Sequence, residues 1–309
     1  MKEMWSHLGG FGKLLVIVTL IFTSFMVFSL LALLAALPFT DGFSLSNGSQ
    51  LPMSIGMLRY FQLVQSISVF IVPSLLAGWV FWGHPTRGIG FSNPKQGSVV
   101  LSFLIILSAQ PLVSYLGVWN SSMQLPEFLG GMEKWMAQSE ESAAGIIHRF
   151  LDTDDPAILF LNFLMIAILP ALGEEMLFRG VLQPVFGEWF RNKHIAVLIT
   201  AFLFSAIHLQ FFTFLPRFFL GLALGYLMIW SRNLWYPIAG HFANNFLSLT
   251  IFYYYRHTNP NINPLEPNAE TLSFAWVFPS FFFLGILFWI FFRKEKKASR
   301  KDFFNNPII

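Results

Sequence analysis

Eight apolar runs divide this chain of 309 residues, and each is near the ~20 residues that a helix needs to cross ~30 Å of hydrocarbon. They lie at 13–38, 58–82, 98–119, 157–187, 194–210, 212–230, 234–255 and 272–292. Hydrophobic residues make up 55% of the chain and charged residues only 11%, whereas about 25% of a soluble domain is charged. Too little charge is left to cover a surface exposed to water. We therefore expect an all-α, polytopic membrane helix bundle of about eight transmembrane helices.

The positive charges indicate how this bundle is oriented. Short cytoplasmic loops of membrane proteins collect Lys and Arg. Here these residues fall in alternate loops, at Lys2, Lys13, Arg87, Lys95, Arg191, Lys193, Arg232 and in the tail RKEKKASRK. The loop 40–57 has none, and the segment 120–156 is acidic. An even number of helices with both termini cytoplasmic fits this pattern. We expect a multi-pass protein of a bacterial inner (cell) membrane.

The chain is predicted to form a single membrane domain over 1–309, because no repeat or low-complexity tract divides it. We assign 1–120 to accessory N-terminal helices and 157–250 to a core that carries the polar residues described next. The lack of Cys excludes thiolate nucleophiles and Cys-ligated metal sites from this chain. The net charge of +3 lies mostly in the tail, so no nucleic-acid partner is predicted. Membrane lipid is the expected surrounding, and the oligomeric state is open.

Three polar clusters interrupt the apolar runs of the core, where an ionisable group costs at least ~2.5–3.5 kcal/mol. Glu174 and Glu175 are adjacent, so their side chains point ~100° apart on a helix. Glu175 and Arg179 are spaced i, i+4 in the order that favours an ion pair, which would make Glu175 structural. Glu174 then needs a partner from another helix. The other two clusters each place two residues on one helix face: Phe204 with His208, and His241 with Asn245.

Depth in the membrane indicates a partner for Glu174. The turn between the fourth and fifth runs centres near Arg191, with Glu174 17 residues before it and His208 17 residues after it. If both arms are helical and antiparallel, the two side chains lie at the same level. We therefore expect a Glu174–His208 pair, provided that Pro170 does not kink the fourth helix enough to change the estimate.

These residue types point to hydrolysis. A neutral histidine beside a buried carboxylate can activate water as a nucleophile. A second histidine and an amide, here His241 and Asn245, can donate hydrogen bonds to an oxyanion. Together they would hydrolyse acyl bonds without a covalent intermediate. A serine-based relay is less well supported, because Ser205 lies three residues before His208 on the same helix.

The three clusters resemble the pattern of the CPBP family, which contains the CAAX proteases and bacteriocin-processing enzymes. That pattern is EExxxR, FxxxH and HxxxN on successive helices. It is matched here by Glu174-Glu175…Arg179, Phe204…His208 and His241…Asn245. The resemblance covers roughly 157–250, about a third of the chain. It implies an intramembrane endopeptidase of the glutamate type, similar to the Ras-converting CAAX endopeptidase.

The resemblance also implies roles for single residues. Glu174 and His208 would activate the water, and His241 and Asn245 would line the oxyanion site. Glu175 and Arg179 would hold the shape of the site, with Phe204 as the remaining motif residue. No metal or cofactor is implied. The expected substrate is a peptide or protein, either CAAX-like or a bacteriocin or other peptide precursor.

Two other functions remain open at this point. A zinc protease could use Glu174, Glu175, His208 and His241 as ligands, although the HExxH motif is absent and the pairing of Glu175 with Arg179 removes one ligand. A non-enzymatic transport or bacteriocin-immunity protein could also hold Glu and His in the membrane, as proton relays do. Against a transporter, the two halves of the chain show no inverted similarity.

Overall fold

The computed structural model describes residues 5, 8–39, 54–258 and 274–305. Its unbroken long helices are α1 (Gly10–Ala36), α4 (Gln96–Ser121), α5 (Gly130–Leu151), α9 (Lys193–Ala206), α10 (Phe214–Ser231), α11 (Trp235–Thr258) and α12 (Phe274–Asn305). Two more long helices, Ile55–Trp82 and Pro156–Phe190, contain π-helical turns. Their α-helical parts are α2 (Ile55–Ser66), α3 (Val72–Trp82), α6 (Pro156–Phe163), α7 (Leu169–Glu175) and α8 (Gln183–Phe190). The described residues contain no strand.

The prediction of an all-helical, multi-pass membrane protein is confirmed. Among the described residues, six helices are long and apolar enough to cross a membrane: Gly10–Ala36, Ile55–Trp82, Gln96–Ser121, Pro156–Phe190, Phe211–Ser231 and Ala275–Lys296. Helix α9 is apolar, but its 14 residues extend over only ~21 Å. Helix α11 has 24 residues and carries His241 and Asn245. The count of eight crossings and the cytoplasmic termini stay predictions, since 1–4, 306–309 and most of the loop 40–57 lie outside the described residues.

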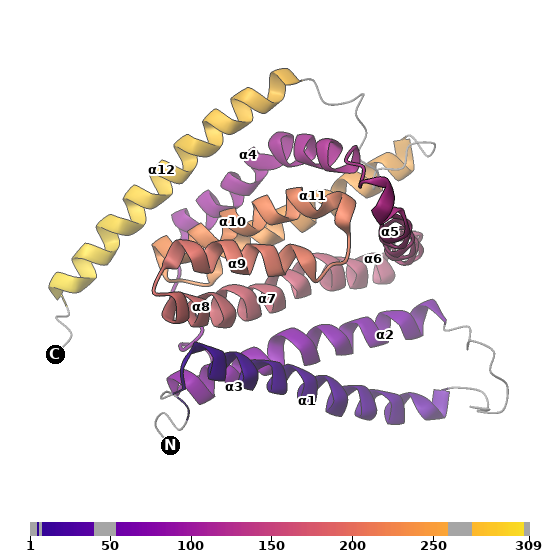
Figure 1. Ribbon diagram of the computed structural model, residues 1–309, viewed down its shortest axis with the longest axis horizontal. Helices are drawn as coiled ribbons and strands as arrows, with labels where there is room; N and C mark the ends of the chain where they lie inside the picture. The colour runs from indigo at the N-terminus through magenta and orange to yellow at the C-terminus, as the bar shows by residue number, and fades with distance from the viewer. Residues whose placement is uncertain (1–4, 6–7, 40–53, 259–273, 306–309) are drawn as a thin grey trace.

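The helices that carry the polar clusters form the centre of the bundle (Figure 1). Helix α4 packs against α10, α11 and α12, and α9 packs between α8 and α10. Helix α7 contacts α11, which brings the first polar cluster beside the third. Helix α12 lies on the outer side of α4, whereas α1, α2 and α3 lie together on the opposite side of the molecule. The site is therefore covered by accessory helices on two sides.

Each π-helical turn precedes a proline. A proline has no N–H to donate, and its ring clashes with the carbonyl four residues earlier. A wider, π-helical turn before the proline relieves this clash. The turns Ile67–Ile71, Leu164–Ile168 and Met176–Leu182 end two residues before Pro73, Pro170 and Pro184 respectively. The kink considered at Pro170 therefore takes the form of a π turn, and α7 has a π turn at each end. The segment that carries both glutamates is held between two helix irregularities.

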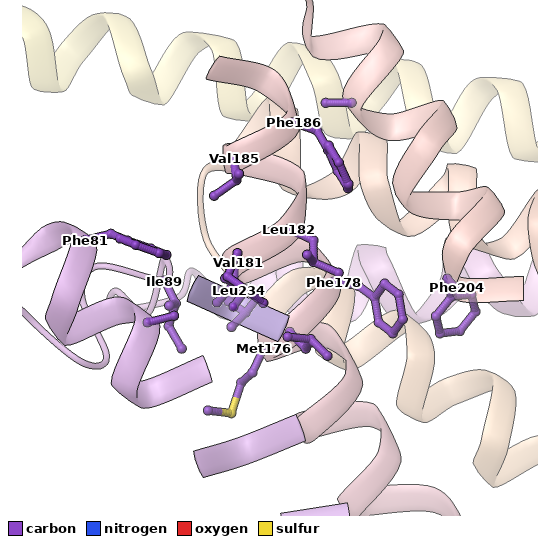
Figure 2. Packing of buried hydrophobic residues seen from close by; sticks show 14 of the residues in the cluster. Phe81, Ile89, Met176, Phe178, Val181, Leu182, Val185, Phe186, Phe204 and Leu234 are labelled. Atoms are coloured by element: carbon purple, nitrogen blue, oxygen red, sulfur yellow. The ribbon is translucent and has the colours of Figure 1, made fainter. Parts of the chain in front are cut away.

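A hydrophobic cluster fixes the helices around α7 and α8 (Figure 2). Phe81 and Ile89 from the α3 region pack with Val181 and Leu234, all four at most 3% exposed. The same cluster includes Phe178 and Phe204, whose rings meet edge to face with centroids 5.3 Å apart. This contact joins the π turn after Glu175 to the last turn of α9.

Candidate active site

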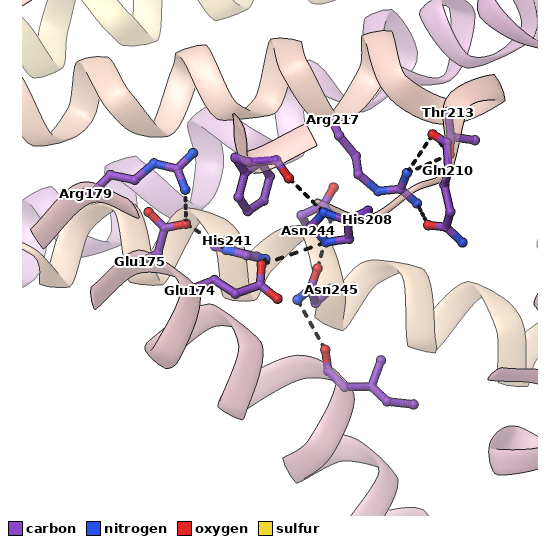
Figure 3. A network of polar contacts seen from close by, with 12 residues as sticks. Glu174, Glu175, Arg179, His208, Gln210, Thr213, Arg217, His241, Asn244 and Asn245 are labelled. Carbon is purple, nitrogen blue, oxygen red and sulfur yellow. Dashed lines mark hydrogen bonds and ion pairs between the residues drawn. The ribbon is translucent and has the colours of Figure 1, made fainter. Parts of the chain in front are cut away.

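The structure brings the three predicted clusters together (Figure 3). Glu174 and Glu175 form the last turn of α7, and His241 and Asn245 lie near the start of α11. The sequence placed His208 inside the fifth helix, but α9 ends at Ala206, two residues earlier. The reason is local: the His208 ring bonds the Phe204 carbonyl through Nδ1 at 2.8 Å, in place of its own backbone N–H. The backbone N–H instead bonds Ser205 O at 3.4 Å.

One part of the site, which we call the closed half, consists of Glu175, Arg179 and the Nδ1 side of His241. The predicted ion pair is present, with Arg179 NH1 2.7 Å from Glu175 Oε1 and both side chains fully buried. His241 Nδ1 bonds the same oxygen at 2.8 Å. Arg179 also donates to Gly221 O at 3.1 Å and lies over the Phe204 ring, 4.6 Å from its centroid. The closed half therefore fixes the orientation of the His241 ring.

The other part, the open half, consists of Glu174, His208 and the Nε2 side of His241. Glu174 Oε2 lies 4.0 Å from His208 Nε2 and 3.9 Å from His241 Nε2. These distances exceed the 2.7–3.2 Å of a direct hydrogen bond. Glu174 Oε2 is buried and has no hydrogen-bond partner among the described residues. Glu174 and His208 are thus close, as predicted, but they are separated by a gap rather than bonded.

The hydrogen bonds of the two rings define which nitrogen carries the proton. A carbonyl or carboxylate oxygen can only accept, so Nδ1 of His208 donates to Phe204 O and Nδ1 of His241 donates to Glu175 Oε1. In a neutral ring the other nitrogen, Nε2, then accepts. Both histidines therefore direct a lone pair toward Glu174. His241 can donate to an oxyanion through Nε2 only when its ring is protonated.

A chain of amides orients Asn245. Its Nδ2 donates to Ile166 O, in the π turn before α7, at 3.2 Å, and its Oδ1 accepts from Asn244 at 3.2 Å. Asn244 in turn accepts from Gln110 of α4 at 3.2 Å. Because an amide nitrogen carries two hydrogens, one N–H of Asn245 is left for another acceptor.

The open half adjoins a cavity of about 70 Å³. Such a volume exceeds the ~10–15 Å³ needed to admit one water molecule. The apolar part of its wall comes mainly from α4, α9 and α10. The polar side chains that line it are His208, Arg217, His241, Asn244 and Asn245. In the part of the chain that the structure describes, no group of three or more His, Asp or Glu is arranged to hold a metal ion.

Arg217 was not among the residues singled out from the sequence. It lies on the first turn of α10, and its NH1 donates to Thr213 Oγ1 at 2.7 Å while its NH2 donates to Gln210 Oε1. An available signal was its position inside the apolar run 212–230, where a charged residue is unusual.

The part of the chain that carries the three polar clusters is similar to known proteins. Residues 156–247 match the family model of the Rce1-like type II CAAX prenyl endopeptidases. This segment is similar to an Rce1-like domain. The match contains all three polar clusters and nearly coincides with the predicted core 157–250, in agreement with the CPBP and CAAX protease family. It supports an intramembrane protease of the CAAX type.

Among curated proteins, the chain is 31% identical over 114 residues to YpbD of Bacillus subtilis (strain 168), which is described as uncharacterized. The matched region is 35% of this chain and 53% of YpbD, so this chain spans about half the length of that relative. No solved structure matches this chain.

Proposed function

We propose that this protein is an intramembrane endopeptidase of the glutamate type, located in a bacterial inner membrane. In this proposal Glu174 and His208 activate a water molecule that attacks the peptide bond. The observation that carries the proposal is the open half: a buried carboxylate oxygen without a hydrogen-bond partner faces two histidine nitrogens at 3.9 and 4.0 Å. A polar contact across more than 3.5 Å is suited to a bridging water.

The chemical step follows from three hydrogen-bond acceptors: Glu174 Oε2, His208 Nε2 and His241 Nε2. A water between them gives one proton to Glu174 or His208, and its oxygen forms a bond to the carbonyl carbon of the substrate. The carbonyl oxygen then carries a negative charge. When the C–N bond breaks, the stored proton passes to the leaving nitrogen, so the products are a carboxylic acid and an amine. No bond between protein and substrate forms at any stage.

The oxyanion is stabilised by His241 and Asn245 in this scheme. Asn245 supplies the N–H that its contact with Ile166 leaves available. His241 contributes through Nε2 when its ring carries both protons, and Glu175 Oε1 accepts from Nδ1. Glu175 and Arg179 do not touch the substrate but orient the His241 ring, and Phe204 carries the carbonyl that orients His208.

The substrate in this proposal is a membrane-associated peptide, CAAX-like or a bacteriocin or other peptide precursor. Helix α9 begins at the turn near Arg191 and ends just before His208 after ~21 Å, less than the ~30 Å of hydrocarbon. With the predicted turn near Arg191 at the membrane surface, the site would lie at a depth that a soluble chain does not reach by itself. A substrate held in the membrane meets this requirement.

A metal-dependent protease at the same residues is the alternative that the open half itself suggests, because Glu174 and two Nε2 lone pairs are also donors that zinc accepts. The test is cleavage of a pool of synthetic peptides by the purified protein in detergent, with the products located by mass spectrometry. Metal-free cleavage by the wild type, and none by Glu174→Ala, supports the proposal. Cleavage that survives Glu174→Ala would mean that the cluster is structural.

A further inference from the structure

A basic cavity lies where the α8–α9 and α10–α11 turns meet, at the end of α9 that is remote from His208. Its volume is about 900 Å³, within the ~300–1,000 Å³ of ligand sites. Arg191 and Lys193 line it from the α8–α9 turn, and Arg232 lines it from the α10–α11 turn. All three side chains are exposed, and none forms an ion pair with a carboxylate in the described part of the chain. The function proposed above uses none of them.

The charge of this basic cavity is not balanced by its own wall. The carboxylate among the lining residues is Glu188, and Lys13 of α1 already pairs with it. The lysine is buried, so this pair is part of the packing between α1 and α8. Three like charges around one hollow repel each other, and an anion between them would relieve the repulsion.

The two turns that carry the arginines have the same construction. Each arginine ends a helix in the left-handed conformation, with φ of 51° at Arg191 and 53° at Arg232. The asparagine that follows each arginine accepts through Oδ1 from the backbone N–H two residues on, at 2.8 Å for Asn192 and 3.1 Å for Asn233. The left-handed conformation favours Gly or Asn and is unfavourable for a larger side chain. Two arginines in this conformation at one cavity indicate a functional reason for the choice.

The surface of α9 leads from the basic cavity along the bundle. His194 lines the cavity, and Leu198 and Phe202 follow it at intervals of four residues, so the three share one helix face. Leu198 is 49% exposed and Phe202 is 54% exposed. A charged hollow at the start of an exposed apolar stripe matches a molecule in which an anionic group is joined to hydrocarbon chains.

We infer that this basic cavity binds the phosphate group of an anionic phospholipid whose acyl chains lie along the outer face of α9. The planar guanidinium groups of Arg191 and Arg232 can each donate two parallel hydrogen bonds to phosphate oxygens, and Lys193 adds a compact positive charge. The lipid site is separate from the candidate active site, and the inference does not depend on the proposed endopeptidase activity.

The bland alternative is that the arginines only balance the negative C-terminal ends of α8 and α10 and mark the cytoplasmic side of the membrane. The two roles differ in one measurable respect. Neither the helix ends nor the orientation of the chain depends on the headgroup of a bound lipid, whereas a phosphate site prefers a lipid with a net negative charge.

The test is native mass spectrometry of the delipidated protein in detergent, titrated with phosphatidylglycerol or with phosphatidylcholine of the same acyl chains. We expect the wild type to bind one phosphatidylglycerol roughly 10- to 100-fold more tightly than phosphatidylcholine, because two or three cations act on one phosphate. The double variant Arg191→Gly/Arg232→Gly should lose most of this preference. Its melting temperature should not fall, because glycine adopts the left-handed conformation readily.

Two further variants separate the site from charge in general. Arg191→Lys/Arg232→Lys keeps the charges without the planar fork and should retain part of the preference. The matched control is Arg87→Gln/Arg293→Gln, which removes two exposed cations outside the basic cavity and should leave the preference unchanged.

Three outcomes would overturn the inference. The first is equal binding of the two lipids by the wild type. The second is a preference that survives in the double glycine variant, because the arginines would then serve only the helix ends. The third concerns the source of the phosphate: if glycerol phosphate binds as tightly as phosphatidylglycerol, the ligand is a soluble phosphate ester and the lipid assignment is wrong. None of these measurements requires peptide cleavage, so their failure leaves the endopeptidase proposal intact.

Discussion

The closed and open halves of the site begin at adjacent residues and differ in how their charges are satisfied. Glu175 Oε1 accepts from Arg179 at 2.7 Å and from His241 at 2.8 Å, although Glu175 Oε2 and Arg179 Nε have no hydrogen-bond partner in the described part of the chain. Glu174 Oε2, one residue away, has no hydrogen bond to any residue that the structure describes and faces two histidine nitrogens across about 4 Å. A buried group that is paired contributes to the fold, and one that is left unpaired requires another explanation. In the function proposed above, the closed half contributes stability and the open half carries out the chemistry.

The largest expected effect is on catalysis, from Glu174→Gln. The amide has nearly the same size but cannot accept the proton of the water, so cleavage should fall by about 10²- to 10⁴-fold. The melting temperature in detergent should stay near that of the wild type, because no protein hydrogen bond to Oε2 is lost. Cleavage and melting are measured on the same preparation. A large loss of melting temperature would show that Glu174 belongs to the closed half.

Arg179→Met, in contrast, should lower the stability of the protein. The fully buried Glu175 would lose its cation, and removal of one partner of a buried pair costs about 3–5 kcal/mol. We expect a strong drop in melting temperature in detergent. The double variant Glu175→Gln/Arg179→Met, which removes both charges of this pair, should recover part of the loss. A single variant as stable as the wild type would contradict the role given to the closed half.

Asn245→Ala tests the oxyanion site and should lower kcat by about 10²- to 10³-fold with little change in KM, because the donor acts mainly in the transition state. The Asn245→Asp variant is the size-matched comparison and should be no better, since its carboxylate has no N–H to donate. Steady-state kinetics on one cleaved peptide distinguish the two parameters. An effect confined to KM would assign Asn245 to substrate binding.

Gly221→Ala gives the smallest expected effect and probes the packing behind the closed half. A Cβ at Gly221 would lie 3.0 Å from Ala201 Cβ and 3.1 Å from Ala201 Cα, and the Gly221 carbonyl accepts from Arg179. We expect a loss of about 1–3 kcal/mol in unfolding free energy. Gly285→Ala on α12 is the control, since a Cβ there meets nothing within 4 Å. Equal melting of the two variants would show that the α9–α10 contact is not tight.

Local spacing and helix counting predicted part of this arrangement. The i, i+4 spacing of Glu175 and Arg179 suffices for the ion pair, because both residues follow one helical path. Counting from Arg191 predicted the proximity of Glu174 and His208, since errors of one residue shift depth by only ~1.5 Å. Both predictions concern residues close together on one hairpin of helices.

The remaining contacts depend on rotation of one helix about its axis, which spacing does not determine. The bond between His241 Nδ1 and Glu175 joins α11 to α7, and π turns on both sides of α7 change the rotation of that helix. The end of α9 at Ala206 depends on a hydrogen bond from the His208 side chain to Phe204 O. This bond cannot be predicted from the FxxxH motif alone. Arg217 was missed because a charged residue at the start of an apolar run looks like a helix end.

The most direct test of the central claim is peptide cleavage by purified wild type, Glu174→Gln and His208→Ala, each with and without a tight zinc chelator. We expect wild-type cleavage to be indifferent to the chelator and both variants to be inactive, with melting temperatures close to that of the wild type. Wild-type activity that is abolished by the chelator and restored by zinc would contradict the account, because the open half would then be a metal site.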